Sequence, residues 1–175
     1  CAYGADKGIP EVRNCFKNAV DAARGKGSDV LDIFANLPES AIEVFETKGE
    51  HVDKKINAAI VVKIPKGAIL AFRGTEGSYQ DWLHNIFLTS IKNVSKGEIF
   101  DDGRHYGFNQ SLESLSKQIR AGKIWPHLKD QSNNILYITG HSKGGALATG
   151  ATVDLHGEFE NIETYTFEAA RFFTS

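Results

Sequence analysis

The sequence contains no methionine, only two cysteines and only four prolines among its 175 residues. A chain without methionine does not begin at its own start codon, so we expect a processed or trimmed product. No apolar run is long enough to cross a bilayer, which argues against a membrane-spanning segment. The formal net charge of −2 gives no electrostatic basis for binding nucleic acid or an anionic membrane. The six histidines are scattered without metal-ligand spacing, so we predict neither a metal nor another cofactor.

The two cysteines, Cys1 and Cys15, are too few for a disulfide scaffold, but three interpretations stay open. They could pair with each other, as in an exported protein. Cys1 could instead be the lipid-bearing first residue of a processed lipoprotein. In the third interpretation Cys1 is simply where the chain begins, and Cys15 is a core residue. The first two favour a secreted or cell-envelope location, which the sequence does not otherwise specify.

The composition, 41% hydrophobic and 24% charged, is that of an ordinary globular protein, and the length favours one domain over residues 1–175. Apolar periodicity predicts helices from residue 10, around residues 28–35, and over residues 106–121 and 146–155. The helix over residues 106–121 should carry Phe108, Leu112, Leu115 and Ile119 on one face. Strands are predicted over residues 58–64, 68–72, 135–139 and 163–167. The first two strands should form an antiparallel hairpin around Pro65-Lys66-Gly67. The later alternation of strands and helices predicts parallel pairing and an α/β fold.

The strand over residues 135–139 runs into Gly140-His141-Ser142-Lys143-Gly144, and a small-residue helix follows. A Gly-x-Ser-x-Gly turn between a strand and a helix is typical of a nucleophile elbow, which presents a serine hydroxyl at the end of a sheet. The glycines suit this turn because side chains at those positions would clash across it. An ordinary glycine-rich loop is the alternative interpretation. A phosphate-binding loop is excluded because Lys143 is followed by glycine and not by serine or threonine.

Four motifs follow one another in order: Phe72-Arg73-Gly74-Thr75 with Asp81-Trp82, His105-Tyr106-Gly107-Phe108, the Gly140–Gly145 turn, and Thr166-Phe167 before Arg171. Together they resemble the class 3, fungal-lipase-like α/β-hydrolases, over about two-thirds of the chain. The resemblance implies a mostly parallel central sheet with flanking helices that lacks its last strands, because this chain is C-terminally incomplete relative to the family.

The resemblance also implies roles for individual residues. Ser142 is the nucleophile, and the backbone N–H groups of Lys143 and Thr75 form the oxyanion hole, to which the Thr75 hydroxyl can add. Arg73 and Asp81 are architectural, and Trp82 belongs to the core or a pocket wall. His105 is a motif residue but not the catalytic base. His141 packs or hydrogen-bonds beneath the elbow, and the Lys143 side chain is expected to be solvated.

The sequence departs from the family pattern at the expected lid and at one strand end. Residues 76–80 are too short and polar for an amphipathic lid, although Phe87, Leu88, Ile91 and Val94 could provide an apolar cover. Glu168 stands where relatives usually have glycine, and Ala170 where they usually have proline. We therefore expect the end of the last strand to turn differently.

The acid and the base that should activate Ser142 are missing from the expected positions. In this fold they follow the nucleophile in the chain. The only aspartate and histidine after Ser142 are Asp154 and His156, which lie about 18 and 21 Å along the next helix and cannot reach it. Glu168 is the one carboxylate near the correct end of the sheet. We expect the acid and the histidine to lie outside these 175 residues.

Three functions remain open. The favoured one is a serine ester hydrolase that acts on lipids or other carboxylic esters through an acyl-enzyme on Ser142, and that is nearly inert as this piece alone. The second is a non-catalytic relative that binds acyl ligands or a partner. The third is a protein completed by another chain, for example a homo-oligomer formed through an open sheet edge. The sequence does not specify the acyl chain or the head group.

Overall fold

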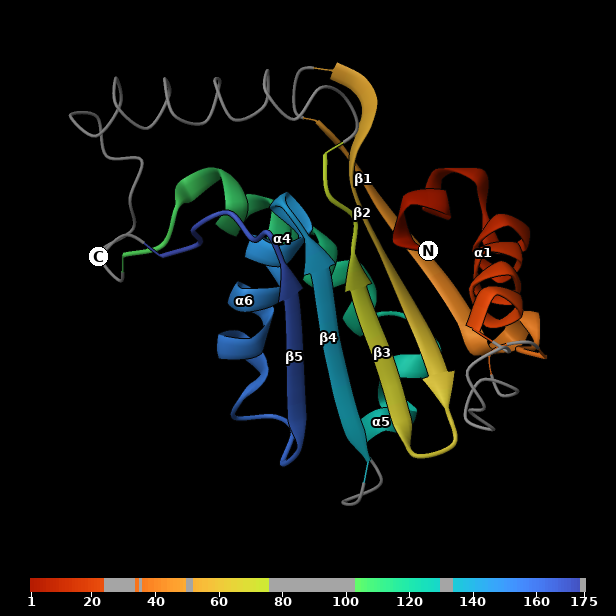
Figure 1. Ribbon diagram of the computed structural model, residues 1–175. Coiled ribbons are helices and arrows are strands. Elements are labelled where there is room, and N and C mark those ends of the chain that lie inside the picture. The colour runs from red at the N-terminus through yellow and green to blue at the C-terminus, as the bar shows by residue number, and fades with distance from the viewer. Residues whose placement is uncertain (24–33, 35, 50–51, 76–102, 130–133, 174–175) are drawn as a thin grey trace.

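The computed structural model describes residues 1–175 except 24–33, 35, 50–51, 76–102, 130–133 and 174–175. Its centre is a five-stranded sheet in the order β1-β2-β3-β4-β5, shown in Figure 1. The strands are β1 (Ile42–Gly49), β2 (Val52–Ile64), β3 (Gly67–Phe72), β4 (Ile135–His141) and β5 (Ile162–Phe167). The described helices are α1 (Ile9–Ala23), α4 (Tyr106–Arg120), α5 (Ile124–Lys129) and α6 (Lys143–Leu155), with short 3-10 turns η1 (Ala2–Lys7) and η4 (Glu39–Ala41).

The sheet is antiparallel on one side and parallel on the other. Strands β1, β2 and β3 pair antiparallel, whereas β3, β4 and β5 pair parallel. The predicted hairpin is confirmed between β2 and β3, with Ile64 opposite Gly67. Gly67 has a φ of 144°, and a Cβ there would overlap the backbone of Ile135 on the next strand. The α/β architecture is therefore confirmed, as a mixed sheet in which two of the four pairings are parallel.

Helices cover both faces of the sheet, and β2 shows why. Ala59 and Val61 on β2 face the cluster that contains α4, α5 and α6. Their neighbours Ala58 and Ile60 face the second cluster, which contains η1 and α1. A strand with helices on both faces needs apolar side chains on both. The predicted apolar face of α4 is confirmed, because Phe108, Leu112, Leu115 and Ile119 are all buried in the first cluster.

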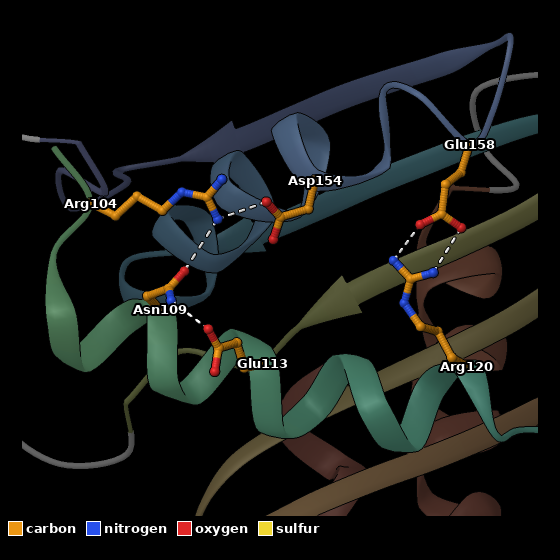
Figure 2. Close-up of polar contacts among 6 residues, drawn as sticks. All are labelled: Arg104, Asn109, Glu113, Arg120, Asp154 and Glu158. Carbon is orange, nitrogen blue, oxygen red and sulfur yellow. Dashed lines mark hydrogen bonds and ion pairs between the residues drawn. The ribbon is translucent and has the colours of Figure 1, made fainter. Parts of the chain in front are cut away.

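Ion pairs join α4 and its N-terminal flank to the end of α6, as Figure 2 shows. Arg104 Nη1 lies 2.7 Å from Asp154 Oδ1, and the same guanidinium donates to Asn109 Oδ1. Near the other end of α4, Arg120 donates to both carboxylate oxygens of Glu158 at 2.7 and 2.5 Å. Asp154 thus ties α6 to the segment that precedes α4, which agrees with its exclusion from catalysis.

The structure chooses between the interpretations of the cysteines. Cys1 and Cys15 form a disulfide with their Cα atoms 5.3 Å apart. This bond ties η1 to α1, and Ala2 and Ala5 of η1 are buried against the sheet. No sequence pattern predicted η1 or α5. The helix expected around residues 28–35 lies outside the described residues, except for Phe34.

Strand β5 lies at one edge of the sheet. Beyond the partly buried Ile162, all of its residues are exposed, and Tyr165 and Phe167 are 55% and 60% exposed. Among the described residues, no strand pairs with the outer edge of β5. None of the described helices is both long and apolar enough to cross a membrane.

Candidate active site

Ser142 lies at the junction of β4 and α6, in the turn that the sequence predicts as an elbow. Its φ and ψ are 56° and −120°. Among the described non-glycine residues, only Ser142 and Glu168 have a positive φ. Such a conformation costs free energy and persists only where the surroundings impose it. The strained turn predicted from the sequence is therefore present.

The glycines around Ser142 are required by close backbone contacts. A Cβ on Gly140 would overlap the carbonyl of Gly144 and lie 2.8 Å from the nitrogen of Gly145. A Cβ on Gly144 would overlap the carbonyl of Phe72, at the end of β3. Real Cβ atoms do not approach backbone atoms so closely, so neither position accepts a side chain without movement.

The same contacts bring the elbow against the segment that carries Thr75. Gly140 pairs with Phe72 in the sheet, and the Cα of Gly74 packs so near the carbonyl of His141 that a Cβ would lie 2.8 Å from it. Thr75 is the next residue. Its hydroxyl oxygen is buried, and no described group hydrogen-bonds to it. The ends of two parallel strands thus bring the backbone just before Thr75 against the elbow.

Ser142 is only 4% exposed, so it is more buried than the sequence-based expectation of a presented hydroxyl. Its N–H donates to the Phe167 carbonyl at 2.9 Å, and its carbonyl accepts from the N–H groups of Ala146 and Ala170. The Ser142 hydroxyl does not cap the described α6. The end of β5 therefore holds the serine backbone in place, while the side chain is left out of the helix cap.

Lys143 corrects one expectation. Its side chain is not solvated but half-buried, and its Nζ donates to Asn57 Oδ1 at 2.5 Å. Asn57 in turn donates to Thr47 Oγ1. Burial, and to a smaller extent the positive charge of Arg73, lowers the pKa of Lys143 from 10.5 to about 8. The lysine is thus an internal cation beside the elbow.

His141 makes hydrogen bonds beside the elbow, as expected, and its partners come from two other parts of the fold. Its Nδ1 lies 3.1 Å from the Tyr3 hydroxyl, and its Nε2 lies 3.2 Å from Glu168 Oε2. Because a carboxylate only accepts, Nε2 carries the proton in the neutral ring and Nδ1 accepts from Tyr3. No sequence pattern pointed to Tyr3, which lies 138 positions from His141.

The end of β5 turns at Glu168, which has a φ of 46°. Glycine adopts this conformation at little cost, whereas a glutamate there is strained. Glu168 is exposed, and its contact with His141 confirms that it lies at the same end of the sheet as Ser142.

The remaining candidates have structural positions or lie outside the described residues. Arg73 is 3% exposed and pairs with Asp6 at 3.8 Å, as suits an architectural residue. His105 is the N-cap residue of α4, and its ring contacts Phe108. His156 is exposed at the C-terminal end of α6. Asp81, Trp82 and the possible lid and cover residues lie outside the described part of the chain.

Solved structures of fungal lipases are similar to this fold. The lipase from Rhizopus microsporus var. chinensis matches with a TM-score of 0.51 and 18% identity, over 98% of this chain and 59% of that one. Lipase II from Rhizopus niveus matches with a TM-score of 0.54 and 20% identity, over 91% and 63%. The Lip2 lipase from Yarrowia lipolytica has a TM-score of 0.50 and 22% identity, over 91% and 58%. The chain thus spans about three-fifths of the length of these lipases.

A family model described as Lipase (class 3) matches residues 69–175. The match begins within β3 and includes Thr75, the Gly140–Gly145 turn and the end of β5. It covers more than half of the sequence, most of β3, and all of β4 and β5. This chain therefore belongs to the class 3 lipase family.

Proposed function

We propose that this protein is a serine ester hydrolase that acts on lipid or other carboxylic esters, with Ser142 as its nucleophile. The observation that carries the proposal is the positive φ of Ser142 at the β4–α6 junction, directly against the end of β3. Family membership and the fungal lipase fold support the reaction class. They do not indicate which acyl chain or head group the protein accepts.

In the proposed reaction the Ser142 hydroxyl attacks the ester carbonyl. Negative charge then develops on the carbonyl oxygen, and the N–H groups of Lys143 and Thr75 stabilise it. Collapse of this intermediate expels the alcohol and leaves an acyl-enzyme, which water hydrolyses. The buried Thr75 hydroxyl supports this assignment, since it is a donor without a described partner.

Serine needs a base that takes its proton and returns it to the leaving alkoxide, together with an acid that orients that base. His141 is held by Tyr3 and Glu168, and Asp154 is held by Arg104, so neither residue is available for this role. We propose that the base and the acid come from outside the described residues.

Fluorophosphonate labelling tests the proposal, because the probe reacts with activated serines. We expect the longest natural form of the protein to be labelled at one site and the Ser142→Ala variant to lose the label and all esterase activity. Ser111→Ala is the matched control, since its hydroxyl donates to the Gly107 carbonyl within α4, away from the elbow. No labelling of a folded full-length protein would overturn the proposal in favour of a non-catalytic acyl-binding or partner-binding relative.

The exposed β5 strand favours one further possibility, in which a second copy of the chain pairs with this edge. An unpaired edge strand with exposed aromatic side chains is a template for association. We propose such a homo-oligomer as the alternative to coverage of β5 by further residues of the same protein.

A further inference from the structure

The N-terminal turn η1 contacts both of the segments that form the proposed oxyanion hole. The Tyr3 hydroxyl hydrogen-bonds His141, which directly precedes Ser142. The same hydroxyl lies against Gly74, which directly precedes Thr75, since a Cβ on Gly74 would overlap it. One side chain therefore touches the neighbour of the nucleophile and the neighbour of the second oxyanion donor.

A second residue of η1 reaches the same strand end. Asp6 Oδ1 lies 3.8 Å from Nη1 of Arg73, which is almost fully buried. A buried guanidinium needs a nearby negative charge, so the pair restrains the backbone just before Gly74 and Thr75. Tyr3 and Asp6 thus hold the 73–75 segment from two positions on one short turn.

The turn that carries these residues is itself anchored. The disulfide from Cys1 to Cys15 ties its beginning to α1, and Ala2 and Ala5 are buried on the sheet face that α1 covers. Isolated 3-10 turns of this length are weak, so tertiary contacts and the covalent bond must set their position. Opening the disulfide would leave only the noncovalent contacts to hold Tyr3 in place.

We infer that Tyr3 and Asp6 are positioning residues for the oxyanion hole, and that the Cys1–Cys15 disulfide holds them there. They act through His141 and Arg73 by keeping the Lys143 and Thr75 amides at a separation that fits one oxyanion. Small displacements of such donors reduce the rate of the chemical step strongly, while substrate affinity is affected much less. This inference rests on the proposed ester hydrolase function, and its test below separates the two.

The first test is the Tyr3→Phe variant of the full-length protein, which removes one hydroxyl and preserves the ring. We expect kcat and the rate of fluorophosphonate labelling to fall about tenfold, with KM and the melting temperature nearly unchanged. The matched control is Tyr165→Phe, which removes a hydroxyl that donates to Glu163 on β5. It should label at the wild-type rate. Equal rates for Tyr3→Phe and the control would overturn the inference.

The second test addresses the disulfide. The Cys1→Ser and Cys15→Ser double variant should show a similar loss of labelling rate. Dithiothreitol, which reduces the bond to two thiols and becomes a cyclic disulfide, should slow the wild-type protein and leave the double variant unchanged. A wild-type rate in the double variant would show that the noncovalent contacts suffice, and would overturn the role of the disulfide.

Hydrogen exchange gives a readout that does not depend on activity. We expect faster exchange of the amides at residues 73–75 and 140–145 in Tyr3→Phe and in the double variant, but not in Tyr165→Phe. If the wild-type protein is not labelled at all, the proposed function fails, yet this difference still decides whether η1 holds the two segments. Unchanged exchange in both variants would overturn the positioning role.

Discussion

Strands β4 and β5 lie side by side in the same sheet, yet their environments differ sharply. Strand β4 has a paired neighbour on each edge, and its alternate residues Leu136, Ile138 and Gly140 are buried. Strand β5 is paired on one edge only, and its last five residues are exposed. Ser142, the proposed nucleophile, follows the enclosed strand, while the open strand supplies the Phe167 carbonyl that accepts from the Ser142 N–H. The site therefore lies where the tightly packed part of the sheet meets its exposed edge.

The largest expected effect is the difference in stability between side-chain truncations on β4 and on β5. Ile138→Ala on β4 should lower the free energy of unfolding by about 2–5 kcal/mol, because it leaves a cavity in a close-packed core. Phe167→Ala on β5 should change it by less than about 0.5 kcal/mol, because the ring is 60% exposed. Urea unfolding of both variants measures the difference.

Sedimentation velocity of the wild-type protein and of Phe167→Ala shows whether a second copy covers β5 in solution. A large loss of stability in Phe167→Ala, together with a change from dimer to monomer, would mean that a second copy covers β5. The contrast between the strands would then be a property of the isolated chain only.

The next effect concerns the glycines at the end of β4. Gly140→Ala should destabilise the protein by about 1–3 kcal/mol and slow the labelling of Ser142, because the new methyl group overlaps the Gly144 backbone. Gly157→Ala is the matched control, since a Cβ there meets nothing within 4 Å. Thermal unfolding and labelling rates measure both variants. Equal stability of the two would contradict the close packing of the elbow.

The third effect is a pH dependence from Lys143. Its pKa is about 8 in the folded protein and near 10.5 when exposed. Between these values the unfolded chain binds more protons than the folded one, so the lysine makes the free energy of unfolding rise with pH there. Lys143→Met should remove this rise, while Lys63→Met, at an exposed position on β2, should keep it. Urea midpoints at pH 7.5, 9 and 10 test this prediction, and a rise that persists in Lys143→Met would contradict it.

Much of the parallel half of the fold could be predicted because its signals are local. The apolar run before Gly140 and the small residues after Gly144 predict a strand, a turn and a helix over one short segment. The periodicity of Phe108, Leu112, Leu115 and Ile119 predicted α4 and its buried face in the same way. Helix α5 was missed because it is only six residues long and contains Pro126, which weakens a helical pattern.

The residues of the candidate site likewise divide into those that local sequence predicted and those that only long-range contacts revealed. Ser142, Lys143 and Thr75 were predicted from motifs in which the informative residues are consecutive in the sequence. Tyr3 was missed because nothing in its neighbours indicates that it will meet His141 across most of the chain. The expectation for the Lys143 side chain was wrong because burial depends on what packs around a residue, and Asn57 comes from a distant strand.

The amino-acid sequence by itself determined the elbow, the order of its motifs and the glycines without which the turn cannot close. Those features depend on backbone conformation and on contacts between near neighbours. Only the tertiary structure decided that Ser142 is enclosed, that Lys143 is an internal cation and that a disulfide-tethered turn contacts both sides of the site. Burial and long-range contacts arise when distant segments pack together, so no short stretch of sequence contains them.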